Sequence, residues 1–214
     1  MMSDAAEERA RLERLVAEMR GTLGEEHLAT LSAMLDLADR LWAEGRLIAA
    51  RKIETQVVAG RRRALGEEHF DTLKAIGKLA VTMAAQGDLI GARELQERVV
   101  EGMRRLDGDN GRDTLRAINN LAGTLSAQGD LDAALELLES VVAVTCCEFG
   151  EPDPDSLAAL GNLAAVLWQQ GDRDEAYALQ QHVVELRCRA SGDRDPAACA
   201  AVEVLEMMER DFRS

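Results

Sequence analysis

Hydrophobic residues along the chain are spaced as in amphipathic helices. The apolar positions of one stretch are Leu157, Leu160, Leu163, Ala164 and Leu167. Intervals of three and four residues place these side chains on one helix face. Asp153 and Pro154 suit the start of this helix, because aspartate caps free N–H groups and proline fits the first turn. Gly171 suits its end, since glycine adopts the left-handed conformation at low cost. We therefore predict a helix over residues 154–170.

A second helix is predicted directly after the first, over residues 173–190. Its apolar face consists of Ala176, Leu179, Val183 and Leu186. Asp172 follows the glycine stop and is expected to cap this helix. The Gly-Asp pair recurs at residues 87–88 and 129–130. At the corresponding place earlier in the chain, Gly45 is followed by Arg46, so that cap is lost.

The helix pair recurs every 42 residues. LGEEHLATL at residues 23–31 returns as LGEEHFDTL at residues 65–73. Two glycine ladders keep the same step: Gly24, Gly66, Gly108, Gly150 and Gly192, and Gly45, Gly87, Gly129 and Gly171. Alanine follows at Ala38, Ala80, Ala122 and Ala164, and at Ala50, Ala92, Ala134 and Ala176. A fixed period of this size indicates a repeat architecture.

The repeats predict one continuous all-α array of antiparallel helix pairs. Writing A and B for the first and second helix of each pair, the order is B, four AB pairs, then A. The expected parts are a capping half-repeat at 1–22, full repeats at 23–64, 65–106, 107–148 and 149–190, and a second capping half-repeat at 191–214. The lone helices are expected over residues 4–21 and 196–212, with polar outer faces that cover the ends of the core.

Composition narrows the possible functions. The chain of 214 residues is 47% hydrophobic but only 3% aromatic, which favours helices packed closely on small residues. A net charge of −14 argues against nucleic acid as a partner, because phosphate contacts dominate such binding. Without a signal-type apolar run or a membrane-length apolar stretch, we expect a soluble, cytoplasmic protein with no membrane partner.

No catalytic, cofactor or metal motif is found in the sequence. Cys146, Cys147, Cys188 and Cys199 form no CxxC pair and no zinc-type cluster. We expect them to be reduced, partly buried thiols. His27 and His69 occupy a helix-cap slot, and His182 has no second ligand nearby. The expectation is a protein that is not an enzyme and that needs neither cofactor nor metal.

The repeat resembles the tetratricopeptide repeat (TPR), and more closely the 42-residue version found in kinesin light chains. The matching segments are NNLAGTLSAQGDLDAALELLESVV at 119–142, GNLAAVLWQQGDRDEAYALQQHVV at 161–184, and the LGEEH-type linkers. The resemblance implies a right-handed α-solenoid, the TPR superhelix. It also implies a concave groove lined by the A helices, which in the family holds short linear peptides. No kinesin-light-chain heptad region is found, so a motor role does not follow.

Helix-wheel counting from Leu31, Leu73, Leu115 and Leu157 selects the groove positions. Outside the binding set below, these positions include Ser32, Leu35, Asp36, Asp39, Gly77, Gly123, Ser126, Gly161 and Ala165. The predicted peptide-binding residues are Trp42, Lys74, Lys78, Arg116, Asn119, Asn120, Asn162 and Trp168. Lysine and arginine there predict a cationic patch at the middle of the groove, and asparagine amides suit a peptide backbone. Glycine at these positions leaves room for a ligand, although tight helix packing explains it equally well.

Two functions follow from these observations. The first is a non-catalytic scaffold or adaptor for a protein partner, and the resemblance to the TPR family implies that it binds an extended, acidic or carboxylate-bearing peptide. The alternative is a self-assembling structural protein that forms dimers or end-to-end oligomers. The sequence identifies neither the partner nor the oligomeric state.

Overall fold

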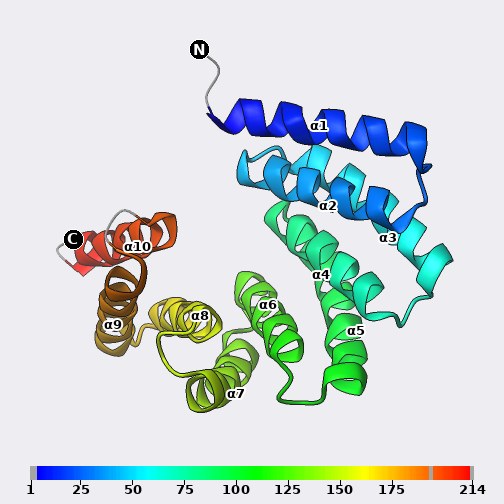
Figure 1. Ribbon diagram of the computed structural model, residues 1–214. Coiled ribbons are helices and arrows are strands. Elements are labelled where there is room, and N and C mark those ends of the chain that lie inside the picture. The colour runs from blue at the N-terminus through cyan, green and yellow to red at the C-terminus, as the bar shows by residue number, and fades with distance from the viewer. Residues whose placement is uncertain (1–3, 193–194, 213–214) are drawn as a thin grey trace. The chain divides into compact units, whose positions relative to one another are not determined.

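The computed structural model describes residues 4–192 and 195–212, which form α-helices joined by short turns (Figure 1). The helices are α1 (Asp4–Thr22), α2 (Leu28–Ala43), α3 (Leu47–Leu65), α4 (Phe70–Ala85), α5 (Leu89–Asp107), α6 (Arg112–Gln128), α7 (Leu131–Phe149), α8 (Pro154–Gln170), α9 (Arg173–Ser191) and α10 (Pro196–Phe212). The described residues contain no strand. The predicted helix over 154–170 coincides with α8, and the other three predicted ranges agree with α1, α9 and α10 to within one residue.

The chain divides into two compact units, residues 1–108 and 109–214. In the first unit each of α1 to α4 packs against the helix that follows it in the chain. The second unit repeats this arrangement from α6 to α10, and α6 also contacts α8. Each unit is therefore a stack of antiparallel helix pairs. That all repeats form one continuous array stays a prediction.

Glycines lie in the turns between the helices of both units. Every glycine of the two ladders has a positive φ, from 72° at Gly45 to 101° at Gly171. In this region an L side chain is strained, so only glycine is accommodated cheaply. At Gly171 the N–H groups of the turn return to the carbonyls of Leu167 and Trp168, which closes α8 as predicted.

Side chains cap some of the helix starts. The Oδ1 atom of Asp153 accepts a hydrogen bond from the N–H of Asp155 at 2.9 Å, as predicted for the start of α8. His27 and His69 are also caps, because the Nδ1 atom of each accepts from the N–H two residues later.

The Gly-Asp caps are only partly confirmed. Asp88 accepts a hydrogen bond from the N–H of Gly91 at 3.3 Å. Asp130 and Asp172 have nearly the same backbone angles as Asp88 but make no side-chain cap bond, so these two predictions are wrong.

The core of each unit is built on the alanine ladders. All eight of these alanines have no exposed surface. Their small side chains let helices A and B of a pair approach closely, and leucine and valine fill the space around them. Gly60 and Gly102 serve the same purpose on helices B: an added Cβ atom would come within 2.9 Å of Leu31 and 2.6 Å of Leu73.

The four cysteines form no disulfide in the structure. Cys146 and Cys188 are partly buried, whereas Cys147 and Cys199 are exposed, which corrects the expectation for the latter two. Within the described ranges, no helix is long and apolar enough to cross a membrane.

Candidate peptide-binding surface

The A helices carry the candidate site, α2 and α4 in the first unit and α6 and α8 in the second. Trp42 lies near the end of α2 with 45% of its surface exposed. On α4, the Nζ atom of Lys74 lies 5.2 Å from the centroid of the Phe70 ring, within cation–π range. Leu35, predicted to face the groove, is instead 7% exposed and belongs to the core. Helix α2 packs against α1 and α3, and a helix wheel drawn from α2 alone does not locate the edges that these neighbours cover.

Lys78 is held in an ion pair within the first unit. Its Nζ atom lies 2.6 Å from both carboxylate oxygens of Asp39 on α2. The Lys78 side chain is 39% exposed and the Asp39 side chain 50% exposed, so the pair stays in contact with solvent. An exposed pair of this kind contributes little to stability and exchanges partners readily.

A buried carboxyl group lies close to this ion pair. Glu54 on α3 is only 2% exposed, and its Oε1 atom accepts a hydrogen bond from the Thr82 hydroxyl at 2.9 Å. Its Oε2 atom is buried without a hydrogen-bond partner among the described residues. Burial raises the pKa of Glu54 to about 7, and the negative charge of Asp39 adds to the effect, while Thr82 and Lys78 oppose it.

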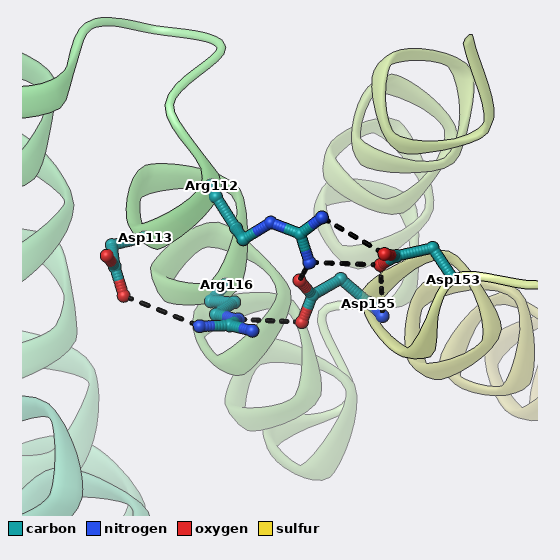
Figure 2. Close-up of polar contacts among 5 residues, drawn as sticks. All are labelled: Arg112, Asp113, Arg116, Asp153 and Asp155. Carbon is teal, nitrogen blue, oxygen red and sulfur yellow. Dashed lines mark hydrogen bonds and ion pairs between the residues drawn. The ribbon is translucent and has the colours of Figure 1, made fainter. Parts of the chain in front are cut away.

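In the second unit, Arg116 belongs to a network that joins the starts of α6 and α8 (Figure 2). Its Nε atom lies 2.6 Å from Asp155 Oδ1, and its Nη1 atom lies 3.7 Å from Asp113. Hydrogen bonding to Asp155 is the largest cause of a raised pKa for this guanidinium. The predicted cation is present, but carboxylates of the chain already compensate its charge.

Arg112 completes this network and also fixes the cap of α8. Its two Nη atoms approach the two oxygens of Asp153 at 3.1 and 3.0 Å, and Nη1 lies 2.5 Å from Asp155. The guanidinium also lies 4.0 Å from the Phe149 ring centroid. Hydrogen bonding from Arg112 lowers the pKa of Asp153, so the carboxylate stays ionised while it caps the helix.

Two of the predicted asparagines contact each other across α6 and α8. The Nδ2 atom of Asn162 donates a hydrogen bond to Asn119 Oδ1 at 3.0 Å. Each amide keeps further donor and acceptor positions. Asn120 is exposed beside them. Trp168 on α8 is half-buried, and its ring centroid lies 5.3 Å from the Arg173 guanidinium.

The helix-interior glycines on this face have open space above them. A Cβ atom at Gly123 or Gly161 would meet nothing within 4 Å, and one at Gly77 would only touch Val99 at 3.8 Å. Tight packing therefore does not explain these glycines, in contrast to Gly60 and Gly102. Ser126, predicted to line the same face, is instead 8% exposed, and its hydroxyl accepts a hydrogen bond from Gln169 at 3.1 Å.

The sequence interpretation missed the acidic partners of the basic residues. A usable signal was present, since the paired residues lie close to one repeat apart. Lys78 pairs with a residue 39 positions away, Arg116 with one 39 away and Arg112 with one 41 away. A search for opposite charges near this separation would have found all three pairs.

Comparison with known proteins identifies the repeat. One family model described as tetratricopeptide repeat matches residues 71–145. A second model with the same description matches residues 30–71 and 156–197. A crystal structure of a putative kinesin light chain from Podosopora anserina, with nearly identical TPR-like repeats, is 30% identical to this chain, with a TM-score of 0.67. That match covers 89% of this chain and 90% of the other. The chain is a TPR protein of the kinesin-light-chain-like type.

Further structures agree on the fold of this TPR protein. A point variant of the Podosopora anserina protein is 31% identical over 86% of this chain and 87% of its own, with a TM-score of 0.69. BtubC (BKLC) from P. vanneervenii has a TM-score of 0.71 over 99% of this chain and 87% of its own. Its identity of 18% shows the fold alone. No match is found among curated proteins. The fold is thus the all-α TPR solenoid class that the sequence predicts.

TPR repeats indicate a protein–protein interaction scaffold, and proteins of this fold are typically not enzymes. No group of three or more histidine, cysteine, aspartate or glutamate side chains within residues 4–192 and 195–212 is arranged to hold a metal.

Proposed function

We propose that the A-helix faces of this TPR protein bind an extended peptide that carries acidic side chains or a free C-terminal carboxylate. The observation that supports this most directly is the open space above Gly123 and Gly161. A glycine inside a helix costs roughly 1 kcal/mol relative to alanine. Clearance for a ligand backbone is a physical reason for glycine at these positions.

Polar groups beside that space suit a peptide backbone. Asn119, Asn120 and Asn162 offer both donors and acceptors, so they can satisfy the N–H and C=O groups of an extended chain. Because Asn119 and Asn162 already hold each other, they are preorganised, which lowers the ordering cost of binding. Trp168 on the same helix as Asn162 supplies apolar contact area.

The basic residues support an acidic ligand through exchange of partners. Lys78 and Arg116 are both partly exposed, with side-chain exposures of 39% and 47%. A peptide carboxylate can replace water at these cations and share them with Asp39 and Asp155, giving charge-assisted hydrogen bonds. Lys74 and Trp42 of the first unit belong to the same proposal. A cytoplasmic location stays a prediction.

A peptide array tests this function. The array contains acidic sequences, each with a free C-terminal carboxylate and as the C-terminal amide. Fluorescence anisotropy then measures the affinity of the bound sequences for the wild type, Asn120→Ala and Asn162→Ala. We expect each variant to weaken binding about tenfold, through loss of backbone hydrogen bonds. The double variant Lys74→Glu with Arg116→Glu should weaken the binding of peptides with a free C-terminal carboxylate more than the binding of the corresponding amides.

Ser140→Ala is the matched control, because Ser140 is exposed on helix B of the same repeat as Asn120. Its affinity should equal that of the wild type. Equal binding by all variants, or an array without any bound sequence, overturns the proposal. The alternative function, self-assembly, requires a surface of its own.

A further inference from the structure

Two isoleucines in the first unit are far more exposed than its other large apolar side chains. Ile48 at the start of α3 is 84% exposed, and Ile90 at the start of α5 is 74% exposed. They occupy the same slot of successive repeats, 42 residues apart. The same slot in the second unit holds Asp132 and Asp174, both exposed. Aspartate is favoured in the first turn of a helix, where it faces free N–H groups, so isoleucine at this slot needs a separate reason.

The two isoleucines lie on one edge of the first unit. Arg51 on α3 contacts Asp88, the N-cap of α5, at 2.9 Å, which brings the two helix starts together. Ile48 itself lines a hollow with Leu47, Arg51 and Gln86, between the start of α3 and the end of α4. The edge therefore carries one exposed isoleucine at the start of each of the two helices that the Arg51–Asp88 contact joins.

Charges beside the isoleucines have opposite signs on the two helices. One turn after Ile48 is Lys52, and one turn after Ile90 is Glu94, each on the same helix face as its isoleucine. Both charged side chains are exposed, and neither forms an ion pair with a described residue. Before Ile48 is Arg46, also exposed and unpaired among the described residues. The α3 strip (Arg46, Ile48, Lys52) is basic. In the α5 strip (Asp88, Ile90, Glu94), Arg51 already compensates the charge of Asp88, so the negative charge of this strip comes from Glu94.

We propose that this edge is the contact surface for a second copy of the chain. In a two-fold dimer, if residue i of one protomer contacts residue j of its partner, j also contacts i. The α3 strip of each protomer then faces the α5 strip of the other. Each isoleucine packs against an isoleucine, and each lysine meets a glutamate, so both contacts occur twice. A single strip of one sign does not have this self-complementarity.

The proposed contact consists of only three residues from each strip, so the dimer is expected to be reversible and concentration-dependent. It uses helices B, whereas the proposed peptide site uses helices A. The two proposals therefore fail separately. Peptide affinity measured on the array should be unchanged by substitutions in the strips.

Sedimentation velocity on the full chain, from micromolar to near-millimolar concentration, tests the proposal. The wild type should dimerise reversibly, and Ile48→Asp should raise the dissociation constant about tenfold or more. The double variant Ile48→Asp with Ile90→Asp should be monomeric over the same concentration range. Aspartate already occupies this slot at Asp132 and Asp174, so both variants are expected to fold, with unchanged circular dichroism. Met207→Asp, at an exposed residue of α10, is the control and should dimerise as the wild type does.

A charge swap provides the sharper test. Lys52→Glu alone should weaken the dimer, because two glutamates then face each other. Adding Glu94→Lys restores opposite charges at both contacts and should restore the wild-type dissociation constant. A wild type that is monomeric at every concentration overturns the proposal. So does a dimer that tolerates both isoleucine substitutions, or a charge swap that restores nothing.

Discussion

At the scale of single residues, Glu54 stands out because its ionisable carboxyl group is buried. In the same slot of the later repeats are Gln96, Leu138 and Gln180, all of them buried. Gln180 satisfies its amide by donating to the carbonyl of Ala201 at 2.8 Å. Only Glu54 carries an ionisable group here, and one of its oxygens has no partner among the described residues. Its protonation should therefore influence stability.

We predict that Glu54 makes the fold less stable as the pH rises. Its pKa is raised from 4.5 to about 7 in the folded state, so the folded chain holds the proton more tightly than the unfolded chain. The resulting stabilisation is present below the unfolded pKa and is lost as the pH rises through the folded pKa. A shift of this size corresponds to about 3 kcal/mol. Urea unfolding from about pH 5 to pH 8 measures the free energy of unfolding in the wild type and in Glu54→Gln.

The difference between the two proteins isolates Glu54 from all other titrating groups. Glu54→Gln should gain stability relative to the wild type as the pH rises. Glu139→Gln, at an exposed glutamate of α7, is the control and should follow the wild type at every pH. A wild-type minus Glu54→Gln difference that stays constant with pH would contradict the prediction.

At the scale of the element, the helix glycines form two groups with opposite expected effects. Gly123 and Gly161 lie on open helix faces, so alanine should raise the free energy of unfolding by about 0.5–1 kcal/mol at each. Gly102 faces the buried Leu73, where a Cβ atom would come within 2.6 Å. Gly102→Ala should therefore lower the free energy of unfolding by about 1–3 kcal/mol. Urea unfolding measures both effects.

Gly60→Ala is the matched comparison for Gly102→Ala, because Gly60 faces Leu31 in the same slot of the preceding repeat. Both should destabilise in the same direction. Stabilisation by alanine at either of these two sites, or destabilisation at Gly123, would show that the distinction between open and packed faces is wrong.

Helix positions were predictable from the sequence because their signals are local. A glycine with positive φ or a cap such as Asp153 acts within a few residues of the helix end. Contacts between helices were not predictable in the same way. A helix wheel gives the face of Lys78 but not its distance from Asp39, and it missed the burial of Leu35. The backbone angles at Asp130 and Asp172 match those at Asp88, so the repeat pattern does not distinguish the two failed caps from the one that forms.

At the scale of the whole molecule, the first and last helices carry no alanine at the ladder positions. Continuing the A-helix ladder past Ala164 by one period gives Glu206 on α10, and continuing the B-helix ladder back from Ala50 gives Glu8 on α1. Both glutamates are exposed, and Glu8 pairs with Arg40 at 3.3 Å. The ladder alanines are fully buried where helices A and B approach closely. The two glutamates therefore occupy positions where another helix would otherwise pack.

These glutamates oppose end-to-end stacking of copies. If α10 of one copy paired with α1 of the next as helices A and B, Glu206 and Glu8 would enter the slots that buried alanines fill elsewhere. Burying two carboxylates without partners costs several kcal/mol.

We predict that Glu8→Ala combined with Glu206→Ala, made in the Ile48→Asp, Ile90→Asp background, forms oligomers whose mass grows with concentration. Light scattering measures this growth, and the background removes dimers that use the strips. Glu203→Ala, at another exposed glutamate of α10, is the control and should stay monomeric in that background. If the variant lacking both glutamates also stays monomeric, these two charges are not what opposes the stacking of α10 of one copy on α1 of another.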